Sequence, residues 1–158
     1  MALRLGHLLV NRGVITEDQR ANILDEQRIT GRPFGELAEN MFGVSPKDVE
    51  AAWAEQYASL AEWLDPREEP TDPAALNLIT RRQAWQFGLL PLRFEGEELR
   101  IATTQEHLVR ALGFSSWGLG VPCYFVLAKR DEMAAALMKH YPMQGADQHL
   151  LASSGRAA

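Results

Sequence analysis

The sequence has few of the features that mark secreted, membrane-spanning or nucleic-acid-binding proteins. Its single cysteine, Cys123, cannot form a disulfide within the chain, which fits a reducing compartment. No run of 18 apolar residues occurs, so no membrane insertion is expected, and residues 1–27 lack the apolar stretch of a signal peptide. The formal net charge of −5 argues against bulk binding to nucleic acid or to an anionic membrane. These absences predict a soluble cytoplasmic protein.

The motifs of common enzyme classes are also missing. The chain has no P-loop for a nucleoside triphosphate, no nucleophile elbow and no paired Cys-x-x-Cys. The histidines are isolated and lack the spacing of metal ligands. The sequence therefore predicts a binding module and not an enzyme, with no metal and no cofactor. The four histidines are His7, His107, His140 and His149.

A tandem repeat occupies the first 56 residues. Two segments align with a spacing of 29 residues between Gly6 and Gly35, and again between Gln27 and Gln56. One extra residue before Gly43 is cancelled by one missing residue after it. A repeat constrains an architecture more firmly than the helix propensities of single residues do. The alignment therefore predicts the same structure for both segments.

Each copy predicts a short helix, a glycine break and a longer helix. Gly13 and Gly43 stand where a helix would end in the left-handed conformation, so both are expected to have a positive φ. Two packed helical hairpins, with glycines in the turns and glutamines at exposed helix ends, explain the repeat by itself, and it does not require a ligand. The capping signals for the two longer helices are Thr16 with Gln19, and Ser45 followed by Pro46.

The second half predicts a small α+β unit of two strands, a helix, a strand and a helix. Before it, Asp72 with Pro73, and Thr80 with Gln83, mark the starts of two short helices. The expected elements are helices at 72–79 and 80–88, strands at 89–94 and 99–103, a helix at 106–112, a strand at 121–127 and a helix at 131–140.

The fold class is therefore α+β, with a helical repeat subdomain packed on a small ββαβα subdomain. The predicted divisions are a helical subdomain at 1–60 with motifs at 4–27 and 33–56, a connecting loop at 61–71, the α+β subdomain at 72–142 and a disordered tail at 143–158.

The run Arg4-Leu5-Gly6-x-x-Leu9-x-x-x-Gly13, closing with Leu24-x-x-Gln27, resembles the MshEN-type domain. That family forms the N-terminal domain of type II secretion and type IV pilus assembly ATPases and also occurs on other bacterial proteins. The resemblance covers about residues 4–141. In many members the two motifs bind the bacterial second messenger cyclic di-GMP.

The resemblance implies a cyclic di-GMP site made by both motifs. A guanidinium from Arg4 would meet a guanine, and Gly6 and Gly35 would let backbone N–H groups approach phosphate. Apolar side chains would lie under the bases, and two glutamine amides would bind polar edges. The implied ligand residues are Arg4, Leu5, Gly6, Leu9, Leu24, Gln27, Phe34, Gly35, Glu36, Val49, Trp53 and Gln56.

Several positions depart from the family pattern, and in the second motif Ala38, Val49 and Trp53 replace the usual leucines. Arg20 stands where the first motif has an apolar residue, and Pro33 stands where the second motif begins with a basic one. Gln105 follows the second strand at a family-like acidic position. The alternative function is therefore a protein–protein docking module with a degenerate ligand site, whose partner belongs to a secretion, pilus or polysaccharide-export system.

Overall fold

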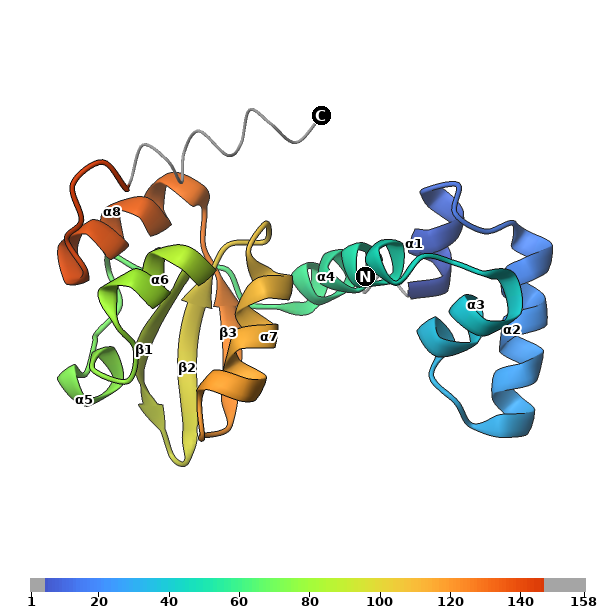
Figure 1. Cartoon of the computed structure of the whole chain (residues 1–158), viewed down its shortest axis with the longest axis horizontal. Coiled ribbons are helices and arrows are strands. Elements are labelled where there is room, and N and C mark those ends of the chain that lie inside the picture. Colours follow the sequence, from blue (N-terminus) through green and yellow to red (C-terminus); the bar gives the residue numbers. More distant parts are fainter. Residues whose placement is uncertain (1–4, 147–158) are drawn as a thin grey trace. The chain divides into compact units, whose positions relative to one another are not determined.

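The structure is a computed structural model that describes residues 5–146, without the side chains of residues 116 and 117. Its elements divide into two compact units, with the division between Leu60 and Ala61. The helical unit holds α1 (Leu5–Asn11), α2 (Glu17–Thr30), α3 (Phe34–Phe42) and α4 (Pro46–Leu60) (Figure 1). The second unit holds α5 (Pro73–Leu76), α6 (Arg81–Phe87), β1 (Leu89–Glu95), β2 (Glu98–Thr103), α7 (Leu108–Gly118), β3 (Cys123–Leu127) and α8 (Arg130–His140).

The expected helix boundaries in the helical unit are confirmed at both glycine breaks. Gly13 has φ 72° and Gly43 has φ 66°, a region that glycine enters without steric cost. Thr16 caps α2 through a capping box with Gln19, and Pro46 occupies the first position of α4. Each copy therefore forms a short helix followed by a long one.

The core of the helical unit is built from equivalent positions of the two copies. Each short helix packs chiefly on the long helix of the other copy, α1 on α4 and α3 on α2. The eight buried core residues form four pairs with a spacing of 29, which are Leu8 with Leu37, Leu9 with Ala38, Ile15 with Val44, and Ile23 with Ala52.

The one-residue shift between the copies lies in the turns. In the first copy Val14 stands between Gly13 and the buried Ile15, whereas in the second Gly43 directly precedes the buried Val44. The same hydrogen bond still closes both turns, at 3.4 Å from Ile15 N–H to the Leu9 carbonyl and from Val44 N–H to the Ala38 carbonyl. The extra residue of the second copy is taken up by the longer α3, so the register of the core is kept.

The second unit has a three-stranded sheet in the order β1-β2-β3. The β1–β2 hairpin is antiparallel and turns at Gly96, which has φ 64°, while β2 and β3 are parallel and joined through α7. Helices α6 and α7 lie across one face of the sheet (Figure 1), and the rings of Phe87 and Phe114 stack between them at 4.5 Å. The expected order of strands and helices in this unit is confirmed.

Two predicted helices of the second unit have different lengths in the structure. The helix that begins at Pro73 ends at Leu76 and not near Ile79, because Asn77 and the buried Ile79 lie in the turn that leads to the Thr80 cap. The helix expected at 106–112 runs from Leu108 to Gly118. His107 forms the N-cap of that helix, so its first residues are shifted by the turn that follows β2.

The segment between α4 and α5 is ordered by hydrogen bonds to the sheet. Trp63 forms an isolated parallel bridge with Leu127, and Leu64 N–H donates to the Leu127 carbonyl at 2.9 Å. Farther along, Asp72 N–H donates to the Leu92 carbonyl of β1 at 2.8 Å. We call residues 61–72 the strap, since they run from the β3 edge to β1.

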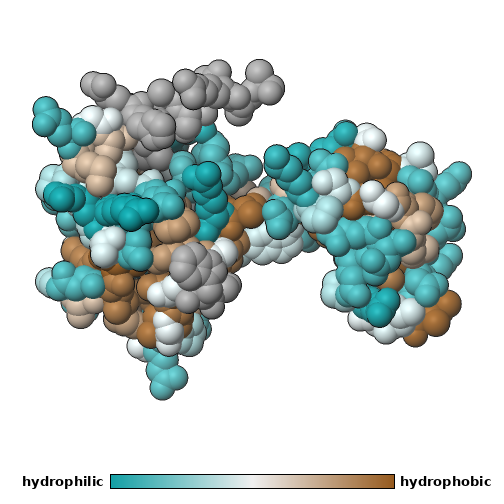
Figure 2. Space-filling model, viewed as in Figure 1, coloured by the Kyte–Doolittle hydropathy of each residue, from teal (hydrophilic) through white to brown (hydrophobic). Residues whose placement is uncertain are grey.

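Hydrophilic side chains cover much of the face of the helical unit seen in Figure 2, with hydrophobic ones in separate places (Figure 2). Of the predicted tail at 143–158, residues 143–146 form a turn in which Ala146 N–H donates to the Met143 carbonyl. The remainder of that predicted tail lies outside the described residues.

Candidate functional site

Gly35 of the second motif lies on α3 in close contact with side chains of α1 and α4. A Cβ atom at Gly35 would lie 2.7 Å from Val49 Cγ1 and 3.6 Å from Leu5 Cδ2. Real Cβ contacts are longer than the first of these distances, so any larger residue would force Val49 or the α3 backbone to move. Three predicted site residues, one from the first motif and two from the second, therefore meet at Gly35.

The first motif repeats this arrangement at Gly6 of α1. A Cβ atom there would lie 2.9 Å from Phe34 Cζ and 3.2 Å from Arg20 Cγ. Two residues therefore cover each glycine. One precedes the glycine of the other copy, and the second lies on the long helix of the same copy. These contacts relate Leu5 to Phe34, Gly6 to Gly35 and Arg20 to Val49, each with a spacing of 29.

The long helices extend this pairing into two equivalent stripes. Residues separated by three or four positions lie on one face of a helix. The stripe that begins at Val49 continues through Trp53, whose ring lies 5.5 Å from that of Tyr57. The predicted site residues and their counterparts form the stripes Arg20, Leu24 and Gln27 on α2, and Val49, Trp53 and Gln56 on α4.

Arg20 is the member of these stripes that the sequence interpretation did not include among the ligand residues. Its side chain is 21% exposed and runs past Gly6, and its guanidinium pairs with Glu17, with Nε donating to Glu17 Oε1 at 2.9 Å. The hydrogen bond from Arg20 lowers the pKa of Glu17. The signal that identifies Arg20 is its spacing of 29 residues from Val49.

The start of the second motif differs from that of the first. Pro33 is the N-cap of α3, at φ −59° and ψ 143°, and makes no side-chain capping hydrogen bond. Arg32, one residue earlier, forms an ion pair with Glu36 at 3.6 Å between Nε and Oε1. Glu36, a predicted site residue, is exposed, and its partner Arg32 precedes the second motif.

The other predicted site residues have different surroundings. Leu9 is fully buried in the helical core, where it makes the turn hydrogen bonds with Val14 and Ile15. Leu24, Gln27 and Gln56 are partly exposed along the stripes. Arg4 lies outside the described residues.

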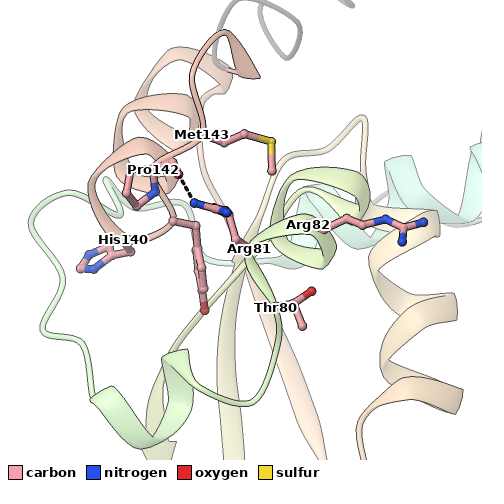
Figure 3. A pocket seen from close by; sticks show the side chains of 7 residues that line it. Thr80, Arg81, Arg82, His140, Pro142 and Met143 are labelled. Carbon is pink, nitrogen blue, oxygen red and sulfur yellow. Dashed lines mark hydrogen bonds between the residues drawn. The ribbon is translucent and has the colours of Figure 1, made fainter.

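A shallow cavity of about 480 Å³ lies in the second unit between the start of α6 and the end of α8 (Figure 3). Arg81 donates to the Pro142 carbonyl at 3.2 Å, and Trp85 Nε1 donates to the Tyr141 carbonyl at 2.7 Å. Burial lowers the pKa of His140, which lines the cavity. These bonds hold the turn after α8 against α6, so the polar groups of the cavity serve the packing of the unit.

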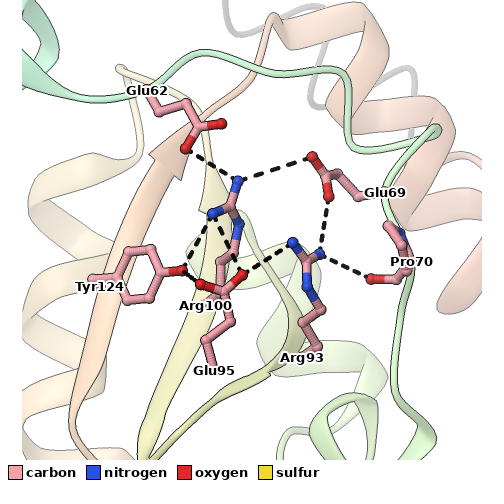
Figure 4. Close-up of polar contacts among 7 residues, drawn as sticks. All are labelled: Glu62, Glu69, Pro70, Arg93, Glu95, Arg100 and Tyr124. Atoms are coloured by element: carbon pink, nitrogen blue, oxygen red, sulfur yellow. Dashed lines mark hydrogen bonds and ion pairs between the residues drawn. The ribbon is translucent and has the colours of Figure 1, made fainter.

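A row of polar side chains crosses the sheet of the second unit. The strand register places Arg93 beside Arg100, and Arg100 beside Tyr124. Arg93 Nη1 lies 2.9 Å from Glu69 Oε2, and Arg100 Nη2 lies 3.1 Å from Glu62 Oε2 (Figure 4). Because both glutamates belong to the strap, the two arginines fasten it to the sheet.

The row is completed by Glu95 at the end of β1. The Tyr124 hydroxyl donates to Glu95 Oε2 at 2.5 Å, and this hydrogen bond, with the nearby Arg100 and Arg93, lowers the pKa of Glu95. Arg100 is 9% exposed, and its Nε has no hydrogen-bond partner among the residues that the structure describes. The ion pairs of this row therefore hold the strap and the end of β1 against the sheet.

Two further polar residues predicted or singled out in the sequence lie near the end of β2. His107 accepts or donates a 2.7 Å hydrogen bond between Nδ1 and Thr104 Oγ1, and burial lowers its pKa. Gln105 is exposed after β2. Within residues 5–146 no group of three or more His, Cys, Asp or Glu side chains is placed to hold a metal ion. No helix in the same range has the length and apolarity needed to span a membrane.

Residues 59–147 match the MshEN domain family, and the chain belongs to that family. The match covers the end of α4 and the second unit. The chain is also similar to the type IV pilus assembly ATPase PilB of Thermus thermophilus, with 26% identity over 155 residues. That alignment covers 98% of this chain and 17% of PilB.

Two solved structures are similar to the chain. The structure of MshE with cdg has 24% sequence identity and a TM-score of 0.49, and the similarity covers 88% of this chain and 99% of that one. The N-terminal domain of XpsE has 17% identity and a TM-score of 0.46, with 87% and 93% of the two chains covered.

Proposed function

We propose that the helical unit binds cyclic di-GMP through both motifs, and that the chain is a regulatory domain of a pilus or secretion ATPase. The observation that carries this proposal is the reciprocal contact at Gly6 and Gly35. Cyclic di-GMP consists of two identical halves, each with a guanine and a phosphate. A unit with two equivalent glycine contacts and two equivalent stripes offers a matching pair of half-sites.

The chemistry of the stripes suits this ligand. Leu24 and Trp53 occupy equivalent places and are partly exposed, so each offers apolar surface to a base. One turn farther along, Gln27 and Gln56 present amides that donate to and accept from the polar edges of guanine. The family relationship supports the proposal, and MshE is a protein whose structure is known with cdg.

Calorimetric titration of the whole chain tests the proposal. Cyclic di-GMP is expected to bind with one ligand per chain, whereas cyclic di-AMP, GTP and ATP bind weakly or not at all. Trp53→Ala should weaken binding about tenfold or more, since base stacking on an aromatic ring contributes about 1–3 kcal/mol. Leu60→Ala, on the same helix and 65% exposed, is the matched control. The absence of any cyclic di-GMP binding would contradict the proposal.

Arg4, which precedes α1, is proposed as the guanidinium that recognises a guanine in the first half-site. Its replacement by alanine should remove about 1–3 kcal/mol of recognition, which corresponds to about a ten- to hundredfold loss of affinity. A folded Arg4→Ala protein that binds as tightly as the wild type would exclude this role for Arg4.

A second candidate function is docking on a partner protein of the pilus or secretion machinery. The observation that favours it is the exposed apolar Ile29 at the end of α2, whose side chain is 81% exposed. Docking predicts that Ile29→Glu keeps the fold and the ligand affinity but impairs pilus assembly or secretion in cells that carry the whole protein. Unchanged assembly with this variant would argue against docking through Ile29.

A further inference from the structure

The two half-sites differ in charge at one pair of equivalent positions. Val49 covers Gly35 in the second copy, and Arg20 covers Gly6 in the first. Two other equivalent pairs, Leu5 with Phe34 at the glycines and Leu24 with Trp53 in the stripes, are apolar in both copies. The residues around Arg20 and Val49 are equivalent, so the two half-sites share one local fold. The first half-site differs by the positive charge of the Arg20 guanidinium.

The position of Arg20 keeps its charged end at the surface of the site. Its Cγ atom lies beside Gly6, so the apolar stem covers the glycine as Val49 does in the other copy. The guanidinium reaches beyond this contact, and the side chain is 21% exposed. Arg20 therefore meets the packing requirement of its position and still presents a cation.

The present partner of Arg20 is itself an anion at the edge of the site. Glu17 is 63% exposed and accepts from Nε and Nη2 of Arg20 through the same oxygen, Oε1. An exposed ion pair of this kind contributes little to stability, because water and salt screen both charges. A phosphate group offers oxygens of the same kind with more negative charge, and two N–H groups of one guanidinium suit it well.

We infer that Arg20 is a phosphate-binding residue of the first half-site, which exchanges Glu17 for a phosphate oxygen of the ligand and makes the two half-sites unequal. This inference rests on the proposed binding of cyclic di-GMP. Glu17 competes with the ligand for the guanidinium. The second half-site, with Val49 at the equivalent position, binds its half of the ligand without this ion pair.

The first test compares Arg20→Gln with the wild type by calorimetry at low and high salt. Glutamine keeps two methylene groups beside Gly6 and removes the charge. Affinity is expected to fall about ten- to hundredfold, as for the loss of a hydrogen bond to a charged group. The dependence of affinity on salt should also become weaker, since an ion pair with phosphate is lost. Arg20→Lys, which keeps a point charge, should recover part of both effects.

Arg28→Gln is the matched control. Arg28 lies on the same helix, about 12 Å farther along its axis, and pairs with Asp25 at 3.0 Å in the same i,i+3 arrangement. The Arg28→Gln variant removes the same charge from the helical unit but at a distance from the site. Affinity and salt dependence should therefore stay within about twofold of the wild type. Circular dichroism of each variant checks that α2 remains folded.

The second test uses Glu17→Gln. This variant should bind cyclic di-GMP more tightly, by about two- to fivefold, because a competing anion has been removed. In the Arg20→Gln background the same change should have almost no effect. An equal gain in both backgrounds would show that Glu17 acts without Arg20 and would overturn the exchange.

The outcomes separate this inference from the proposed function. If the wild type binds cyclic di-GMP and Arg20→Gln binds it equally well with the same salt dependence, the role of Arg20 is wrong and the receptor function stands. If the wild type does not bind, both are wrong. If Arg20→Gln and Arg28→Gln lose affinity equally, the effect is one of net charge and the assignment of Arg20 is again overturned.

Discussion

The two halves of the helical unit share their core and differ at their edges. The four pairs of buried residues keep a spacing of 29 even though the glycine breaks are shifted by one residue. At the edges the first half has Arg20 and a complete capping box at Thr16, whereas the second has Val49 and, at the cap, Ser45 with one longer hydrogen bond from Lys47 N–H. Core positions are constrained by packing from both copies at once, while an edge residue is constrained only by its own surroundings. A helical unit with two equivalent halves in its core can therefore have a binding site whose two halves differ.

The largest expected effect tests whether the shared core is equivalent in both halves. Leu8→Ala and Leu37→Ala each remove a buried leucine side chain, 2% and 3% exposed, from matching places. Each should lower the free energy of unfolding by about 2–5 kcal/mol, and the two values should agree within about 1 kcal/mol. Native-state hydrogen exchange of α2 and α4 amides measures both. A large loss for one leucine and a negligible loss for the other would break the comparison.

The glycine contacts should show a smaller and unequal effect. Gly35→Ala places a methyl group against Val49 Cγ1, on a short and stiff side chain, and should cost about 1–3 kcal/mol. Gly6→Ala meets Phe34 Cζ, at the end of a ring that can turn away, and should cost less. Gly113→Ala, in α7 with nothing within 4 Å of the added atom, should stabilise by about 0.5–1 kcal/mol. Urea denaturation of the three variants measures this order, and an equal cost at Gly6 and Gly35 would contradict it.

The basic residue missing from the second motif gives the next effect, on affinity. Pro33→Arg supplies a guanidinium where Arg4 stands in the first copy, and should tighten cyclic di-GMP binding about tenfold. Arg32→Ala should change affinity little, because Arg32 stands one residue before Pro33, the position equivalent to Arg4. The reverse pattern in calorimetry, a loss with Arg32→Ala and no gain with Pro33→Arg, would mean that Arg32 already serves the second half-site.

The smallest expected effect concerns the two helix caps. Thr16→Ala removes the 3.1 Å hydrogen bond that the threonine hydroxyl accepts from Gln19 N–H and leaves the capping box incomplete, for a loss of about 1 kcal/mol. The Ser45 hydroxyl accepts one longer bond, 3.3 Å from Lys47 N–H, so Ser45→Ala should cost less. Thermal unfolding followed by circular dichroism tests the order of the two variants. A larger loss at Ser45 would contradict it.

The fold was largely predictable because its signals are local. Gly13, Gly43 and the Thr16 and Thr80 capping boxes each fix a helix end within a few residues, and the structure confirms them. The end of α5 and the start of α7 could not be predicted in the same way. Asn77 and His107 take their conformations from the turns that join α5 to α6 and β2 to α7. The strap was predicted only as a connecting loop, since its bonds to Leu127 and Arg100 depend on the sheet.

The candidate site was less accessible from the sequence than the fold. The repeat identified the equivalent positions, but the crossing of the two copies at Gly6 and Gly35 is a tertiary contact that spacing alone does not give. Arg20 was interpreted as a departure from an apolar pattern. In three dimensions its stem satisfies that pattern, and only the guanidinium departs from it.

The most direct test of the account is a titration of the labelled whole chain with cyclic di-GMP, followed by amide NMR. If the two copies hold the two halves of one ligand, the amide signals of Gly6 and Gly35 will shift together and saturate at one ligand per chain. A shift of only one of these signals, saturation at two ligands per chain, or no shift of either would contradict the claim that both motifs form one site.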